Sequence, residues 1–203
     1  TALARAFALV LVKKFRGRTF VRGVFYFPCV VAPIAVAIIW RWMYNADLGF
    51  INSLMEALGI DYALTWLSDP KTSLLALFAA ALWQMVGEPM IFFLAGLQAV
   101  PSELYDAALV DGATPAQKFF YVTLPMIKET FVIVIATLVI NAVHVYDIVQ
   151  GLTNGGPNNA TQVLSTYMYT QTFRYNNLGY GAAISIVMVL MMMVIVVPYI
   201  IAT

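Results

Sequence analysis

Long apolar stretches separated by short polar ones dominate the pattern of this chain. Four of them hold about 20 mostly apolar residues, the length that a helix needs to cross a membrane; they cover residues 24–44, 73–97, 126–149 and 181–201. Because lipid offers no hydrogen-bond partner to the backbone, such stretches predict helices. Pro28 and Pro33 predict a kink in the first of them. We therefore expect an all-α integral membrane protein, folded as a polytopic helical bundle.

An earlier apolar stretch, residues 2–12, is too short to cross a membrane and is typical of the end of a longer helix. The chain opens on Thr1 within this apolar pattern, without an initiator methionine. We therefore expect residues 1–203 to form a single transmembrane domain from which one or more N-terminal helices are missing.

The composition agrees with a membrane protein and narrows the chemistry. Hydrophobic residues make up 62% of the chain and charged residues 10%, whereas a soluble domain carries about 25% charged residues. The net charge of +1 argues against nucleic acid as a partner. A single cysteine, Cys29, and a single histidine, His144, exclude disulfide frameworks and Cys/His metal clusters.

The distribution of lysine and arginine predicts the orientation of the helices. Residues 13–22 hold five basic and no acidic residues, whereas residues 45–70 hold four acidic and no basic ones. By the positive-inside rule the first segment is cytoplasmic and the second is external. Counting spans forward then places residues 101–125 on the cytoplasmic side.

Shorter patterns predict structure outside the spans. Residues 46–60 favour a short amphipathic helix, and residues 163–173 favour another short helix. The sequence Asn154-Gly155-Gly156-Pro157 predicts a tight turn. Arg174 follows the second of these helices, where it either caps the helix or faces a partner.

Residues 101–125 form a polar, turn-rich segment between two apolar stretches. Pro101 suits the first turn of a helix, and Gly112 suits the left-handed residue that follows one. Thr114-Pro115-Ala116-Gln117 then predicts a second helix that Thr114 and Gln117 cap together. We expect two short helices hinged at Gly112, called the two-helix element below, in a compact arrangement suited to docking.

The sequence holds no motif for chemistry of its own. It contains no G-x-x-x-x-G-K-[ST] loop for binding ATP, no H-E-x-x-H and no G-x-S-x-G. An enzyme within the membrane would need a nucleophile with a base, or a metal cluster, and one histidine leaves little room for either. We expect a non-catalytic subunit that receives energy from another polypeptide.

The two-helix element also carries a family resemblance. Asp106-Ala107-Ala108, Gly112, Val122 and Leu124-Pro125 match the spacing E-A-A-x3-G-x9-I-x-L-P, with Asp106 in place of glutamate and Val122 in place of isoleucine. The chain therefore resembles the membrane subunits of binding-protein-dependent ABC importers. The stretches LAGLQAVPSELYDAALVDGA and LTNGGP resemble the sugar-importing, maltose-permease-like branch. The similarity runs from about residue 15 to the C-terminus.

This resemblance implies the ABC importer type I permease fold and a set of partners. They are a second homologous permease subunit, two ATPase subunits, an extracytoplasmic sugar-binding protein and membrane lipid. The chain itself would hold no cofactor, because ATP and magnesium would bind to the ATPase subunits. The resemblance also implies a multi-pass protein of the prokaryotic plasma membrane that translocates a sugar, most simply a di- or oligosaccharide.

In that family the two-helix element docks onto the ATPase and moves with it. Asp106 would pair with a basic residue of the ATPase, over a shorter reach than glutamate has. The small side chains of the two alanines allow one face of the helix to approach a partner closely, and Gly112 allows the chain to reverse. The residues that the resemblance assigns to coupling are Glu103, Asp106, Ala107, Ala108, Gly112, Leu124 and Pro125.

Polar residues at membrane depth predict the route of the transported solute, because each must face protein or water. The pattern Gly87-x-Pro89 interrupts its span near the middle, and broken helices commonly line substrate sites in transporters. Amides beside a flat tryptophan suit a hydroxyl-rich solute. The alternative is that these side chains only hydrogen-bond neighbouring helices. The predicted pathway residues are Trp83, Gln84, Gly87, Glu88, Met90, Asn141, His144 and Val145.

Other functions remain open at this stage. One alternative is an ABC permease for glycerophosphate-type or polyol solutes. A phosphate ligand would favour basic residues on the cavity faces, and the spans offer none at mid-depth. An ion-coupled carrier could use Glu88 but would have no use for the two-helix element. A purely structural scaffold would need neither Glu88 nor the interrupted span.

Overall fold

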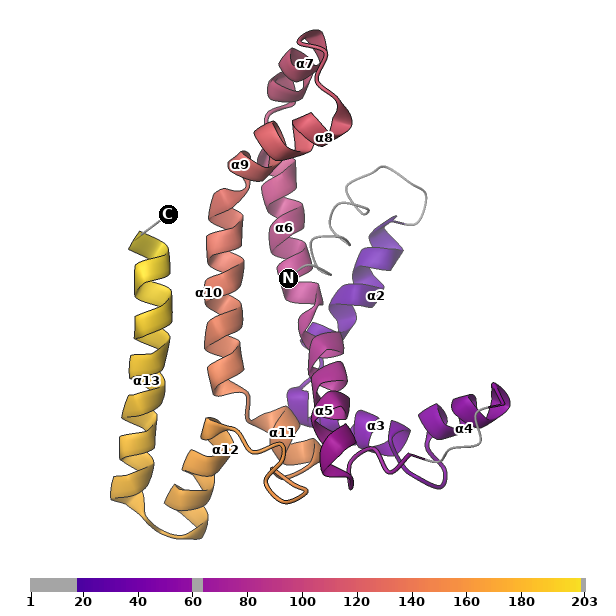
Figure 1. The fold of residues 1–203 in the computed structure, drawn as a ribbon, viewed down its shortest axis with the longest axis vertical. Coiled ribbons are helices and arrows are strands. Elements are labelled where there is room, and N and C mark those ends of the chain that lie inside the picture. Colours follow the sequence, from indigo (N-terminus) through magenta and orange to yellow (C-terminus); the bar gives the residue numbers. More distant parts are fainter. Residues whose placement is uncertain (1–17, 60–63, 202–203) are drawn as a thin grey trace. The chain divides into compact units, whose positions relative to one another are not determined.

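The computed structural model describes residues 18–59 and 64–201, and Figure 1 shows its fold. The predicted partial helix at residues 2–12, with Lys13, Lys14 and Arg16, lies outside these described residues. Every regular element within them is a helix, which confirms the predicted fold class.

The helices follow one another along the chain with short connections, and their labels are those of Figure 1. They are α2 (Arg18–Val30), α3 (Pro33–Met43), α4 (Phe50–Ala57), α5 (Pro70–Met85), α6 (Gly87–Ala99), α7 (Ser102–Val110), α8 (Pro115–Lys118), the π-helix η1 (Phe119–Thr123), α9 (Leu124–Met126), α10 (Lys128–His144), α11 (Asp147–Leu152), α12 (Leu164–Tyr169), the π-helix η2 (Thr170–Arg174) and α13 (Leu178–Ile201).

Two continuous helices are long and apolar enough to cross a membrane. They are Pro70–Ala99, which joins α5 to α6, and Leu178–Tyr199. Two broken pairs also pass on length and composition, namely Thr19–Val30 with Pro33–Met43, and Pro115–Met126 with Lys128–His144. The described residues therefore hold two spans, or up to four if each broken pair is one span.

The structure corrects two of the predicted spans. Residues 24–44 do not form one kinked helix, because α2 ends at Val30 and a new helix, α3, begins at Pro33. A proline has no N–H to give to the preceding turn, so it begins a helix more readily than it continues one. Residues 126–149 are also divided, because α10 ends at His144 and α11 begins at Asp147.

The shorter predictions are confirmed. A helix, α4, lies within residues 46–60, and α12 with η2 covers residues 164–174. The segment after α11 turns tightly, with left-handed backbone at Asn154 (φ 53°) and Gly155 (φ 82°).

The chain packs as two compact units, each with a core of its own. Among the described residues, unit 1 comprises 18–29, 85–139 and 194–201, and unit 2 comprises 30–59, 64–84 and 140–193. Both are built from segments that lie far apart in the sequence.

The core of unit 1 joins α6 to α10. Phe93 and Met90 are fully buried there, and the ring of Phe93 meets that of Phe131 edge-on, with centroids 4.8 Å apart. The buried cluster consists of Met90, Phe93, Leu97, Val100, Ile127 and Val134. Phe25 of α2 packs against it.

Glycine allows the helices of unit 1 to approach closely. A Cβ atom at Gly87 would lie 2.5 Å from the carbonyl oxygen of Phe25 and 2.9 Å from the sulfur of Cys29. The backbone of α2 therefore occupies the space that a side chain at Gly87 would need.

The core of unit 2 joins α3, α5 and α11. Its buried residues are Val36, Ala37, Tyr44, Ala76, Leu77, Ala80, Ile148, Val149 and Leu152. The Tyr44 hydroxyl donates a hydrogen bond of 3.0 Å to the carbonyl of Ala76, which ties the end of α3 to α5.

The close approach at Gly87 gives a stability prediction. We expect Gly87→Ala to lower the free energy of unfolding by about 1–3 kcal/mol, because overpacking must displace the backbone of α2. Gly23→Ala is the matched control, since a Cβ at Gly23 meets nothing within 4 Å. Thermal unfolding in detergent micelles measures both, and equal melting temperatures for the two variants would contradict the packing role of Gly87.

Candidate functional site

The two-helix element, residues 101–125, ends its first helix by a well-defined turn. Gly112 has φ 69°, in the left-handed region that favours glycine. Its N–H donates to the carbonyl of Leu109, and the N–H of Ala113 donates to that of Ala108. These two bonds form a Schellman motif, which satisfies the last carbonyls of α7. The predicted hinge position of Gly112 is confirmed.

The second helix begins as the sequence predicts. The N–H of Gln117 donates to the Thr114 hydroxyl at 3.3 Å, and the N–H of Thr114 donates to the Gln117 side-chain oxygen at 2.8 Å. Pro115 occupies the first turn. From there the chain stays helical through α8, η1 and α9 to Met126, so the second helix is longer than a single turn.

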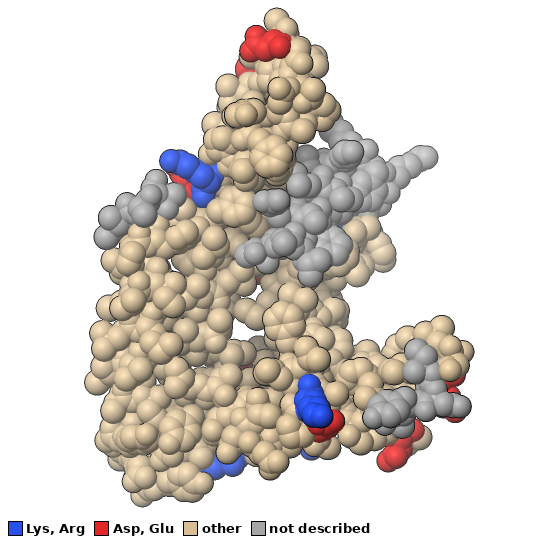
Figure 2. All heavy atoms as spheres, in the orientation of Figure 1, with Lys and Arg blue, Asp and Glu red and all other residues tan. Residues whose placement is uncertain are grey.

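The surface of the two-helix element is both acidic and apolar. Neither α7 nor α8 buries a single residue, and acidic side chains gather over α7 (Figure 2). Large apolar side chains are exposed beside them: Leu104, Leu109, Val110, Phe120 and Tyr121. Such a grouping of exposed apolar residues marks an interaction surface.

The structure brings most of the predicted coupling residues onto this surface. Glu103, Asp106 and Ala107 are exposed on α7, and Ala108 is half-buried. Leu124 and Pro125 lie in α9, where Leu124 is half-buried and Pro125 is exposed. Their contact with an ATPase stays a prediction.

Among the predicted pathway residues, Trp83 belongs to an aromatic cluster in unit 2. Its ring meets that of Trp40 edge-on at 5.8 Å between centroids, and Trp40 in turn meets Tyr44 at 5.2 Å. Trp83 keeps 39% of its surface exposed. It thus presents an aromatic surface backed by a packed cluster.

Gln84 has a structural role that the sequence left as an alternative. Its side-chain amide donates a hydrogen bond of 3.1 Å to the carbonyl of Val31. Val31 lies between α2 and α3, where the helical hydrogen-bond ladder stops. A carbonyl at such a break needs a donor from the protein when lipid surrounds it.

Three other predicted pathway residues lie in α6 of unit 1. Gly87 is buried against α2, and Met90 is fully buried in the core. Glu88 is half-buried in the first turn of α6. A bend at Val86 separates α5 from α6 next to Gly87 and Pro89, but Pro70–Ala99 still passes as one span, so the predicted interruption is a bend within a continuous span.

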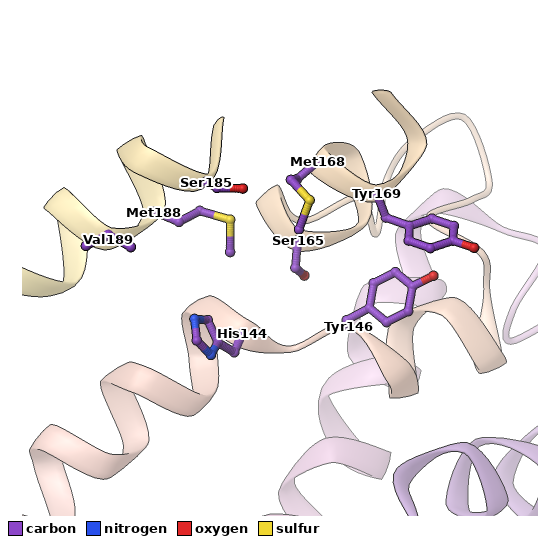
Figure 3. A pocket seen from close by; sticks show the side chains of 8 residues that line it. All are labelled: His144, Tyr146, Ser165, Met168, Tyr169, Ser185, Met188 and Val189. Atoms are coloured by element: carbon purple, nitrogen blue, oxygen red, sulfur yellow. The ribbon is translucent and has the colours of Figure 1, made fainter. Parts of the chain in front are cut away.

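His144 lines a cavity of about 400 Å³ within unit 2. Figure 3 shows how side chains from α10, α12 and α13 converge on it. The lining residues are His144, Tyr146, Ser165, Met168, Tyr169, Ser185, Met188 and Val189. None of them is Asp, Glu, Lys or Arg, so this cavity offers aromatic faces, hydroxyl groups and an imidazole. Its volume lies in the range of small-molecule sites.

Most of this cavity escaped prediction from the sequence. Ser165, Met168 and Tyr169 stand at positions i, i+3 and i+4, and Ser185, Met188 and Val189 repeat this spacing. Residues so spaced share one face of a helix, and this repeated pattern is the signal that could have been used.

The two remaining pathway residues lie near the end of α10. Asn141 is half-buried one turn before His144. Val145 packs against the core of unit 2, and its carbonyl accepts a hydrogen bond from the Ser165 hydroxyl.

Arg174 is tied to the turn that follows α11. Its guanidinium donates to the Asn154 side-chain oxygen at 3.1 Å, and the Gln150 amide donates to the same oxygen at 2.6 Å. Arg174 therefore braces this turn. Within the part of the chain that the structure describes, no three His, Cys, Asp or Glu side chains are grouped to hold a metal ion.

Comparison with known proteins agrees with this architecture. The family described as "Binding-protein-dependent transport system inner membrane component" matches residues 1–203. A probable ABC transporter permease of Pyrococcus horikoshii is 34% identical over 193 residues, covering 95% of this chain and 66% of that protein.

Two further relatives have names that refer to sugars. The trehalose/maltose transport system permease protein MalF of Thermococcus litoralis is 37% identical, over 92% of this chain and 62% of its own length. The multiple sugar-binding transport system permease protein MsmF of Streptococcus mutans is 36% identical, over 89% and 62%. This chain thus spans between 62% and 66% of these three relatives.

A solved structure shares the fold. A bacterial ABC transporter involved in the import of the acidic polysaccharide alginate aligns with a TM-score of 0.86 and 23% identity. The alignment covers 97% of this chain and 69% of that one. The likeness supports the ABC importer permease fold.

The hydrogen bond of Gln84 is testable by replacing its side chain with an apolar one. We expect Gln84→Leu to lower the free energy of unfolding by about 1 kcal/mol, since the Val31 carbonyl loses its donor. Gln98→Leu, at an exposed position of α6, is the control. A Gln84→Leu protein that melts in micelles at the temperature of the control would show that this hydrogen bond does not stabilise the break.

The hinge is testable at Gly112. We expect Gly112→Val to cost roughly 1–2 kcal/mol, because a β-branched residue is strained at positive φ. Gly112→Asn should cost less, since asparagine tolerates this conformation. Limited proteolysis in the two-helix element, compared between the two variants, reports the local opening. Equal cleavage rates would contradict the role assigned to the left-handed residue.

Proposed function

Because the chain belongs to the family of binding-protein-dependent transport system inner membrane components, we propose that it is a permease subunit of an ATP-driven sugar importer. It spans the prokaryotic plasma membrane several times. It works with a second permease subunit, two ATPase subunits and an extracytoplasmic sugar-binding protein. The subunit itself catalyses no reaction, and ATP and magnesium bind to the ATPase subunits.

The observation that carries this proposal is the geometry of the two-helix element. No residue of its first helix is fully buried, acidic and apolar side chains are exposed on it together, and it ends at a hydrogen-bonded turn. Such a surface is suited to sit in a groove of another protein. Closure of the ATPase pair on ATP moves the element, and the permease switches from an inward-facing to an outward-facing state.

The nature of the solute follows from the polar groups of unit 2. The cavity next to His144 is lined by aromatic rings and hydroxyls and by no Asp, Glu, Lys or Arg. Hydroxyl-rich neutral solutes bind through such groups, whereas a phosphate favours lysine or arginine. The names of two relatives refer to sugars as well. The lining therefore favours a neutral sugar over a glycerophosphate-type solute, and the names of the relatives favour a di- or oligosaccharide over a polyol.

Uptake by the assembled importer tests this function. The complex is purified, placed in lipid vesicles and given ATP on the ATPase side. Radiolabelled maltose and radiolabelled glycerol 3-phosphate are each offered on the other side with the binding protein. We expect ATP-dependent uptake of the sugar alone. Uptake of glycerol 3-phosphate alone would favour the phosphate alternative, and sugar uptake driven by an ion gradient without ATP would favour a carrier.

The aromatic surface of Trp83 gives a second prediction for the same assay. We expect Trp83→Ala to reduce uptake of the transported solute about tenfold at low concentration, the equivalent of about 1.4 kcal/mol of lost aromatic contact. Trp42→Ala is the control, because Trp42 is exposed on α3 outside the Trp40–Tyr44–Trp83 cluster. Equal kinetics in the two variants would remove Trp83 from the pathway.

A further inference from the structure

The two helices of the two-helix element are joined by a side-chain hydrogen bond as well as by the chain. The hydroxyl groups of Tyr105 in α7 and Thr123 in η1 lie 3.0 Å apart. The residues are 18 positions apart in the sequence, and the turn at Gly112 lies between them. This contact therefore fixes how α7 folds back onto the second helix.

Thr123 is held in place by its own surroundings. Its side chain is 6% exposed, whereas no residue of α7 or α8 is buried. Its hydroxyl donates to the carbonyl of Lys118 at 3.4 Å. The bond to Tyr105 is the shorter of the two contacts that this hydroxyl makes, and either hydroxyl can donate in it.

The local backbone explains why Thr123 reaches Tyr105. Residues Phe119–Thr123 form a π-helical turn, and the N–H of Leu124 donates to the carbonyl of Phe119. A π-turn inserts one extra residue into a helix and is a frequent feature of functional positions. Thr123 closes this turn and directs its hydroxyl towards α7.

Tyr105 also connects α7 to the core of unit 1. Its ring packs against the buried cluster of α6 and α10 that contains Leu97, Val100 and Ile127. The neighbouring residues Leu104 and Asp106 are exposed. Tyr105 thus contacts the second helix through its hydroxyl and the core through its ring.

We infer that Tyr105 is a positioning residue, which transmits displacement of α7 to α6 and α10 through its ring and keeps the two-helix element rigid through its bond to Thr123. This role rests on the proposed function, because it assigns the step between ATPase docking and movement of the spans. A loosely attached α7 would follow the ATPase without moving the membrane helices. The loss of the hydroxyl then lowers the yield of transport per ATP and leaves ATP hydrolysis in place.

The first test measures rigidity directly in the assembled importer. Nitroxide labels are placed at Val110 in α7 and Ile133 in α10, both of them exposed, and the distance distribution is measured by pulsed electron paramagnetic resonance. We expect a narrow distribution in the otherwise unaltered chain and a broad one with Tyr105→Phe. Tyr175→Phe is the matched control, since Tyr175 is exposed and lies outside the two-helix element. A narrow distribution with Tyr105→Phe would overturn the inference.

The second test measures coupling in vesicles, as molecules of maltose taken up per ATP hydrolysed. We expect a fall of about threefold or more with Tyr105→Phe and with Thr123→Val. The double variant should fall no further than Thr123→Val alone, because the bond between Tyr105 and Thr123 is already absent in that variant. Thr123→Ser, which keeps the hydroxyl, should leave the ratio at the value of the unaltered importer.

The outcomes separate this inference from the proposed function. A normal ratio with Tyr105→Phe, or additive losses in the double variant, would overturn the positioning role. If the unaltered importer shows no ATP-dependent uptake of maltose or glycerol 3-phosphate, the proposed function fails, and the distance distributions alone decide whether Tyr105 holds α7.

Discussion

The left-handed backbone at Gly112 is the constraint on which the functional architecture depends. It ends α7 with two backbone hydrogen bonds, and the capping pair of Thr114 and Gln117 starts the next helix two residues later. These hydrogen bonds end α7 at a defined residue, so α7 neither continues as a longer helix nor passes into a flexible loop. The acidic and apolar face of α7 is exposed as a consequence, and an exposed face of this kind requires a partner.

The membrane imposes the second constraint, because every backbone group at depth needs a donor or acceptor from the protein. At the break between α2 and α3, the side-chain amide of Gln84 donates the hydrogen bond that the carbonyl of Val31 needs. At Gly87 the absence of a side chain allows α6 to lie against the backbone of α2. Two residues that the sequence marks for the transport pathway therefore also build the scaffold. The exposed ring of Trp83 and the cavity beside His144 are left as the surfaces open to a solute.

Local signals could be predicted from the sequence, and long-range ones could not. The caps at Gly112 and Thr114 depend on residues three to five positions apart, so the local sequence predicts both caps. Hydropathy reports that residues 126–149 are apolar but not that the helix stops at His144. The bond from Gln84 to Val31 spans 53 positions, and the cavity joins residues from His144 to Val189. Only the folded chain brings such residues together.

Docking onto the ATPase subunits requires that α7 lie on the cytoplasmic side of the membrane, and this side can be measured directly. A cysteine is introduced at Val110, which is 88% exposed, in a chain whose Cys29 is replaced by serine, and it is treated with a maleimide that cannot cross the membrane. Leu48→Cys, 78% exposed between α3 and α4, is the reference for the opposite side. We expect Val110→Cys to react in inside-out vesicles alone, and bound ATPase subunits to protect it. Reaction of Val110→Cys in right-side-out vesicles would contradict the cytoplasmic position of α7.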